Sequence, residues 1–238
     1  GFFFELFMKS VFLLIFSLFL LLQPLYAQVS EDGSENEKVS NTFREDQFYL
    51  GVSFVALLSN TSSFDQRGLS SQLQLGWVRD IPLVASSKLA LGFGLGHAFH
   101  RYTTNLRLQV SEGVSTNYML DTAEDAPKTI FAARSIDFPI SLRWRDATLD
   151  SFAFWRIYAG VKLRWNYWAK QKNALSKTSI LADLNRWNTE AFLNFGYNTW
   201  NFYLAYDLQP LFIPITLLDS PDQLQIRPIR IGLIFYIL

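Results

Sequence analysis

The stretch FWRIYAGVKLRWNYWAK, residues 154–170, carries cations inside one of the most aromatic runs of the chain. In a helix, with about 100° per residue, Arg156, Lys162 and Arg164 would spread around the axis and leave no apolar face. In a strand, these three cations share one face with other even-numbered residues, and the odd-numbered face is almost entirely apolar. The stretch therefore predicts a β-strand, and one longer than most strands of soluble proteins.

The same alternation with period two recurs elsewhere along the chain. Large apolar residues take one face and small or polar residues take the other, which is typical of strands with unlike surroundings on their two sides. The further segments are 47–58, 71–80, 88–102, 135–145, 190–197, 201–208 and 227–238. With residues 154–170 they predict an all-β chain of eight strands, an even number.

The connections between these segments alternate strictly in length. The long connections are residues 59–70, 103–129, 171–188 and 209–226, and the short connections are residues 81–87, 146–151 and 198–200. An antiparallel up-and-down barrel would place every long loop at one rim, and the short turns and both termini at the other. Bacterial outer-membrane barrels have this arrangement, with the long loops outside the cell.

Alternation alone does not say which face is inside, because a soluble lipocalin-like barrel has the same period. The volume of the side chains decides which face is inside, because about five large side chains per strand exceed what the interior of an eight-stranded barrel can hold. The opposite face carries residues that fit such an interior, namely Gly92, Gly94, Gly96, Ser141, Gly160, Gly196 and Gly232. The tryptophans fall mostly near strand ends, as in the aromatic girdles of membrane barrels. We therefore expect a transmembrane β-barrel.

The amino-terminal region is typical of an exported protein. Met8-Lys9-Ser10 and the apolar run 11–22 predict a signal peptide at residues 1–27, with spurious upstream residues 1–7; an uncleaved anchor is the alternative. Residues 28–46 are polar and charged and predict a flexible periplasmic leader, with the barrel at residues 47–238. We expect the outer membrane as location and both termini in the periplasm.

Composition excludes several classes of function. The chain has no Cys, which excludes disulfides, thiolate metal sites and a cysteine nucleophile. Its formal net charge is +0, and the basic residues do not gather in one run, so no nucleic-acid partner is expected.

Three strand segments carry a family resemblance. They are SIDFPISLRWRD (135–146), FWRIYAGVKLRWNY (154–167) and RPIRIGLIFYIL (227–238). With them the sequence resembles the PorT-like bacterial outer-membrane β-barrel proteins. The resemblance covers residues 47–238, and it rests on the residue pattern of the strands rather than on a catalytic motif. The founding member of that family belongs to the type IX protein secretion machinery. The resemblance therefore implies an outer-membrane barrel with a role in protein secretion, and it implies no active-site residue.

The inward faces of the expected strands carry charged residues. The cations are Arg143, Arg156, Lys162, Arg164 and Arg230, and the acids are Asp137, Glu190 and Asp207. We expect a paired, hydrogen-bonded ionic network that fills a narrow barrel, because buried charges must be paired. The functional alternative is a small-anion site created by the surplus of cations. Eight strands leave little room for a conducting pore.

Few other residues suggest chemistry. His97 and His100 lie near Thr103, and outer-membrane lipid A deacylases use a Ser/His pair, but the His-x-Ser spacing of such enzymes is absent. We expect two histidines at the barrel rim. Asp121, Glu124 and Asp125 are candidate Ca²⁺ ligands in an outer loop, but a solvated acidic loop is expected instead.

The sequence thus predicts a non-enzymatic outer-membrane protein with a scaffold or interaction role and no cofactor. The expected partners are outer-membrane lipid and lipopolysaccharide, together with other envelope or secretion proteins. The alternatives are an enzyme acting on lipid A and a small anion-binding barrel.

Overall fold

The computed structural model describes residues 46–84, 88–110, 116–123, 127–146, 154–172, 177–217 and 220–237. The long strands are β1 (Asp46–Ser59), β2 (Ser71–Pro82), β3 (Leu89–Thr104), β6 (Thr129–Arg145), β7 (Trp155–Lys172), β9 (Trp187–Tyr197), β10 (Trp200–Asp207) and β13 (Ile226–Ile237). The short strands are β4 (Leu106–Val110), β5 (Thr116–Leu120), β8 (Lys177–Ser179), β11 (Ile215–Leu217) and β12 (Ser220–Leu224). The predicted signal peptide and residues 28–45 of the predicted leader lie outside the described residues, whereas Asp46 already belongs to β1.

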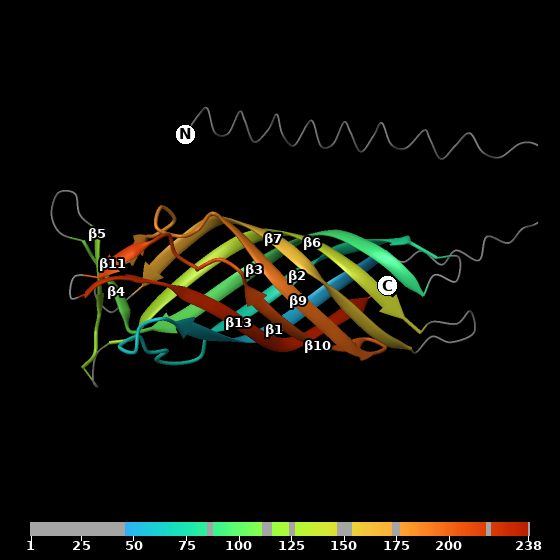
Figure 1. Ribbon diagram of the computed structural model, residues 1–238, viewed down its shortest axis with the longest axis horizontal. Coiled ribbons are helices and arrows are strands. Elements are labelled where there is room, and N and C mark those ends of the chain that lie inside the picture. Colours follow the sequence, from blue (N-terminus) through green and yellow to red (C-terminus); the bar gives the residue numbers. More distant parts are fainter. Residues whose placement is uncertain are drawn as a thin grey trace, which may run out of the picture. The chain divides into compact units, whose positions relative to one another are not determined.

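The long strands form a closed barrel (Figure 1). Hydrogen bonds join them in the order β6-β3-β2-β1-β13-β10-β9-β7, and β6 also pairs with β7, which closes the ring. Every neighbouring pair is antiparallel, and the order follows the chain around the ring. The predicted eight-stranded up-and-down antiparallel barrel is thereby confirmed.

The two ends of the barrel differ. At one end, which we call the short-turn end, lie the strand ends that the connections β2–β3, β6–β7 and β9–β10 join, with the start of β1 and the end of β13. The other end, the long-connection end, carries β4, β5, β11 and β12, which form a separate sheet in the order β12-β11-β5-β4 (left in Figure 1). The connections expected as loops thus contain strands of their own, and β8 extends the barrel sheet beside β7.

An apolar cluster fills the long-connection end. Inward-facing barrel residues such as Val55, Tyr102 and Phe131 pack there against residues of the connections such as Leu184 and Phe212. All of these side chains are buried. Burial of this area stabilises the connections against the barrel, at roughly 25 cal/mol per Å² of apolar surface. It also fills the mouth of the lumen with apolar side chains.

The outside of the barrel is apolar. Large hydrophobic side chains on all eight long strands are exposed, with Phe48 62% exposed and Leu163 42% exposed. The face of each strand that carries the large side chains therefore points outward, as the side-chain volumes predicted. Such a continuous exposed apolar surface exceeds what soluble monomers show and marks a surface that contacts another apolar phase. Within the part of the chain that the structure describes, no helix is long and apolar enough to cross a membrane.

Small residues inside the barrel make room for aromatic ones. Tyr49 of β1 is buried, and its ring and hydroxyl lie over Gly76 of β2 and Gly96 of β3. A Cβ atom at either glycine would collide with Tyr49, and at Gly76 also with the backbone of β3. These two glycines therefore permit a large side chain to cross the lumen close to the wall.

A β-bulge changes the pattern of β7 near the long-connection end. The register between β6 and β7 shifts between Arg134 and Ser135, so that Tyr167 has no partner in the ladder. Before the bulge, even-numbered residues of β7 face inward; after it, Ala169 and Gln171 are the buried residues. A bulge re-aims side chains in this way because one extra residue is inserted into one strand.

Candidate functional site in the barrel lumen

All eight charged residues predicted for the lumen lie inside the barrel. Each is at most 3% exposed: Arg143, Arg156, Lys162, Arg164, Arg230, Asp137, Glu190 and Asp207. They occupy alternate positions on β6, β7, β9, β10 and β13, whose outward positions are mostly apolar. The structure separates them into two groups along the barrel axis.

The first group, which we call the central charge cluster, has Glu190 at its centre. Strand register places Lys162 of β7 opposite Glu190 of β9, and Glu190 opposite Asp207 of β10. The Lys162 ammonium donates to Glu190 Oε1 at 3.0 Å, and Arg230 Nη1 lies 2.9 Å from Glu190 Oε2. The Arg164 guanidinium also donates to Glu190 Oε2. The Glu190 carboxylate thus partly neutralises the charge of three cations.

Two more carboxylates complete the central charge cluster. Arg164 Nη1 donates to both carboxylate oxygens of Asp207 at 3.1 Å, and Arg230 donates to the same carboxylate at 2.5 and 3.2 Å. Arg164 Nε lies 3.6 Å from Asp137 Oδ1. The cluster therefore holds three cations and three carboxylates, all buried. Desolvated charges are tolerated only when they are paired and hydrogen-bonded, which this arrangement provides.

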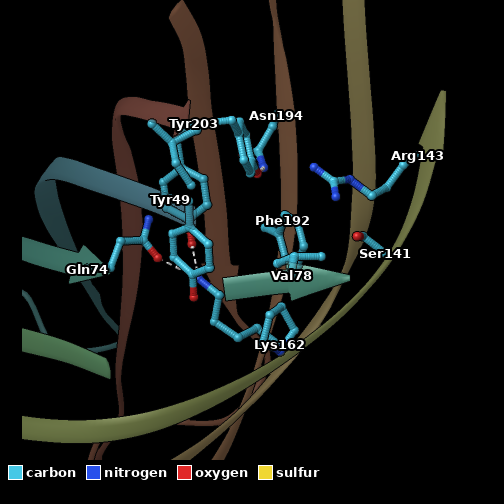
Figure 2. A pocket seen from close by; sticks show the side chains of 12 residues that line it. Tyr49, Gln74, Val78, Ser141, Arg143, Lys162, Phe192, Asn194 and Tyr203 are labelled. Carbon is cyan, nitrogen blue, oxygen red and sulfur yellow. Dashed lines mark hydrogen bonds between the residues drawn. The ribbon is translucent and has the colours of Figure 1, made fainter. Parts of the chain in front are cut away.

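Neutral polar groups extend the central charge cluster. The Lys162 ammonium donates to Gln74 Oε1 and to the Tyr203 hydroxyl, each at 2.8 Å. Tyr203 in turn donates to Glu190. Figure 2 shows Lys162, Gln74 and Tyr203 converging in the lumen from different strands. Lys162 therefore has three oxygen partners, which matches the three donors of an ammonium.

The second group, the short-turn cluster, is richer in cations. Arg143, Arg145 and Arg156 lie there with Asp80, which accepts from Arg143 and, at 3.0 Å, from Arg145. Arg143 also donates to Gln47. Asp80 thus accepts hydrogen bonds from two of these three buried guanidinium groups. Asp80 and Arg145 were not among the predicted site residues, although Asp80 has the same parity as the inward-facing Gln72 and Gln74 on β2.

Aromatic rings and unpaired donors surround the short-turn cluster. The Arg143 guanidinium lies 3.8 Å from the ring centroid of Tyr158, and the Arg156 guanidinium lies 4.4 Å from that of Phe154. Both contacts are close enough for cation–π attraction. Arg156 Nε and Nη1 are buried and have no hydrogen-bond partner within the described residues. The chemistry of this end therefore fits a small anion better than a cation.

Little free space remains between the two clusters. The cavity there has a volume of about 20 Å³ for the centre of a water molecule, and its lining includes Tyr49, Gln74, Arg143, Lys162 and Asn194 (Figure 2). One or two water molecules fill such a space. Side chains, rather than an open channel, occupy this section of the lumen.

The histidines lie on opposite faces of β3. His97 is on the outward face, with Nε2 2.7 Å from the Tyr167 hydroxyl. His100 is buried, so the expectation that both histidines lie at the rim is wrong for His100. The physical reason is the period of the strand, because residues three apart must face opposite sides. Thr103 does not bond to either histidine; its hydroxyl donates to the Leu69 carbonyl at 3.1 Å.

His100 belongs to a buried Ser/His/Asp group that sequence reasoning missed. His100 Nε2 lies 3.1 Å from Ser135 Oγ, and Ser135 donates to Asp137 Oδ1 at 2.7 Å. With its hydroxyl proton directed at Asp137 Oδ1, Ser135 offers His100 Nε2 only its oxygen lone pairs, an arrangement that fits the Nε2–H tautomer of His100. A nucleophilic serine requires the opposite, a histidine nitrogen that accepts the hydroxyl proton. The hydrogen bonds of this group therefore do not run in the order that a catalytic triad requires.

The structure describes only one of the three acids of the predicted acidic loop. Within the described residues, no group of three or more His, Cys, Asp or Glu side chains is placed to hold a metal ion. Asp121 is partly buried and follows β5, and the acids at 124 and 125 lie outside the described residues.

Comparisons with known proteins find no matching family model and no matching curated protein. Solved structures that are similar include two crystal structures of Ail, the attachment invasion locus protein of Yersinia pestis. One, in complex with the heparin analogue sucrose octasulfate, has a TM-score of 0.38 at 10% identity, and 81% of this chain and 97% of that chain are covered. The other has a TM-score of 0.34 at 12% identity, with the same coverage of 81% and 97%.

Proposed function

We propose that this chain is an integral protein of the bacterial outer membrane with a non-enzymatic scaffold or interaction role. The observation that carries the proposal is the combination of an apolar exterior on all eight long strands with a lumen filled by paired charges. This is the reverse of a soluble barrel, in which the apolar side chains face inward.

The position of the barrel in the membrane follows from its two different ends. Membrane barrels of this kind have short turns in the periplasm and long connections outside the cell. The start of β1 and the end of β13 lie at the short-turn end. We therefore infer that both termini are periplasmic and that the sheet of β4, β5, β11 and β12 faces the outside.

The filled lumen supports a scaffold rather than a channel. The central charge cluster crosses the lumen, the cavity beside it has a volume of about 20 Å³, and the apolar cluster occupies the long-connection end. An ion would have to displace paired, desolvated charges to pass, which costs several kcal/mol per ion. Described side chains thus obstruct the lumen at the central charge cluster and at the long-connection end.

The geometry also supports a non-enzymatic role. Ser135 donates its hydroxyl hydrogen bond to Asp137, and His100 is buried on the inward face of the barrel. A lipid A deacylase would need its nucleophile at the lipid-facing surface. We therefore place the interaction role in the outer sheet and the periplasmic leader, and we propose envelope proteins as partners, with secretion components as the resemblance to PorT-like proteins implies.

A planar-bilayer recording of the purified full chain tests the sealed lumen. We expect no conductance steps in concentrated KCl under an applied voltage, since side chains fill the lumen. Steady, ion-selective steps in the unmodified protein would contradict the scaffold proposal. Anion-selective steps that disappear in Arg156→Gln would instead support the small-anion alternative, which the buried, unpartnered donors of Arg156 favour.

A further inference from the structure

Four cations gather on the outside of the barrel near its long-connection end. They are Arg101 of β3, Arg134 of β6, and Lys170 and Lys172 of β7, three strands that are neighbours in the sheet. Arg101, Arg134 and Lys172 are exposed, and Lys170 is half-buried. We call these four residues the basic wall patch.

Strand register places the patch on three successive rows of the sheet. Arg134 is paired with Phe99 on one side and Trp168 on the other. Arg101 and Lys170 flank Ala132 in the next row, so their backbones lie about 10 Å apart, two strand spacings of about 4.8 Å. Lys172 follows one row further along β7, opposite Ile130. The patch thus has roughly the width of a lipid headgroup.

The bulge in β7 and a tryptophan hold part of the patch in place. The Arg134 guanidinium lies 4.8 Å from the ring centroid of Trp168 and 5.6 Å from that of Phe99. The Lys170 ammonium lies 5.4 Å from the Trp168 ring. Because the bulge at Tyr167 shifts β7 by one residue, Trp168 faces outward beside both cations. Cation–π contacts of this kind orient the side chains but leave their charge unbalanced.

No carboxylate among the described residues pairs with the patch. Within the described residues, none of the four cations forms a salt bridge, whereas the exposed cations Arg79 and Lys88 at the short-turn end pair with acids at 3.3 and 2.7 Å. Four like charges on neighbouring strands repel one another, and cross-strand pairs of like charge are destabilising. An anionic partner would remove this repulsion.

The patch lies where the apolar exterior ends. The outward positions of β6 from the short-turn end are Trp144, Leu142, Ile140, Phe138 and Ile136, and Arg134 comes next. These positions span about 20 Å along the barrel axis at the usual strand tilt of about 40°, close to the height of the apolar band in membrane barrels. In the orientation proposed above, the patch therefore lies at the headgroup level of the outer leaflet.

We propose that the basic wall patch binds the phosphate groups of an anionic outer-leaflet glycolipid of the lipopolysaccharide type. Its arginines offer paired donors that match phosphate oxygens, and the lipid's acyl chains would lie against the apolar exterior of β6 and β7. This inference rests on the proposed membrane location and adds a lipid-specific site to it. Lipid chains and headgroup would thus be recognised by adjoining parts of one wall.

The test uses the full chain in phosphatidylcholine nanodiscs and three probes: bisphosphorylated lipid A, the same lipid stripped of both phosphates, and inorganic phosphate. Lipid retention is measured by native mass spectrometry. We expect preferential retention of bisphosphorylated lipid A, lowered about 100-fold in the triple variant R101Q/R134Q/K170Q, since one cation near a membrane surface is worth about fivefold. Arg227→Gln is the matched control, because Arg227 lies at the same end on the opposite wall, facing Leu58 of β1.

The outcomes distinguish failure of the proposed lipid site from failure of the barrel to insert into lipid. Equal retention of the stripped lipid, equal loss in Arg227→Gln, or binding of inorganic phosphate without any lipid preference would each overturn the inference while leaving an inserted barrel. Failure of the unmodified protein to enter nanodiscs at all, judged by size-exclusion chromatography, would instead contradict the proposed function on which the inference rests.

Discussion

Replacement of Glu190 by Ala is expected to destabilise the barrel by about 3–5 kcal/mol. Glu190 is fully buried and accepts from Lys162, Arg164 and Arg230, so its removal leaves three buried cations with fewer counter-charges. The measurement is equilibrium unfolding in urea, with the protein reconstituted in phosphatidylcholine vesicles and unfolding followed by tryptophan fluorescence. Glu190→Gln should be destabilising too, because the amide retains the shape but not the charge.

Asp146→Asn is the matched control for the central charge cluster. Asp146 also pairs with a lysine, Lys88 at 2.7 Å, but both side chains are about half exposed. Exposed pairs of this kind contribute less than about 1 kcal/mol. If Glu190→Ala costs no more than Asp146→Asn, the central charge cluster does not hold the barrel together, and the interpretation of the lumen as a structural plug is wrong.

Replacement of Val161 by Arg is expected to cost about 2–4 kcal/mol in a lipid bilayer. Val161 lies on the outward face of β7, near the middle of the apolar exterior, and is 44% exposed. In water an arginine at such a position would be solvated, and it would hardly change the free energy of unfolding. In lipid the guanidinium must be desolvated or must distort the bilayer. The loss of unfolding free energy in vesicles therefore reports whether residue 161 faces lipid.

Val84→Arg provides the matching change outside the bilayer. Val84 follows β2 in a short connection and is 42% exposed, almost the same fraction as Val161. Its replacement should change the free energy of unfolding by no more than about 0.5 kcal/mol. Equal effects of the two substitutions in vesicles would mean that the apolar exterior does not lie in lipid.

The alternation of residues allowed the barrel to be predicted because each strand position faces one of only two surroundings. Every second residue of β7 from Arg156 to Asn166 except Gly160 is buried, and the residues between are apolar and outward, as the sequence indicated. The same parity placed the charged site residues inside. Parity would also have placed Asp80 and His100 inside, since both share it with small or polar inward residues.

The partners of the charges could not be predicted from parity. Which carboxylates meet Arg164 depends on the register between β6, β7, β9 and β10, and three acids lie near it only because of that register. The bulge at Tyr167 was equally invisible, because one inserted residue in an aromatic run leaves no distinct signal. The short strands of the long connections were missed for a related reason: three to five residues are too few to show a period.

A single-cysteine labelling experiment tests the membrane-embedded barrel most directly. The chain has no Cys, so Phe48→Cys, Leu163→Cys and Leu233→Cys each give one attachment point for a fluorophore, with Leu69→Cys in a long connection as control. After reconstitution, we predict quenching of the first three by spin-labelled lipid and protection from aqueous iodide, with the reverse at Leu69. Quenching of the strand positions by iodide and not by lipid would contradict a barrel whose apolar face lies in the membrane.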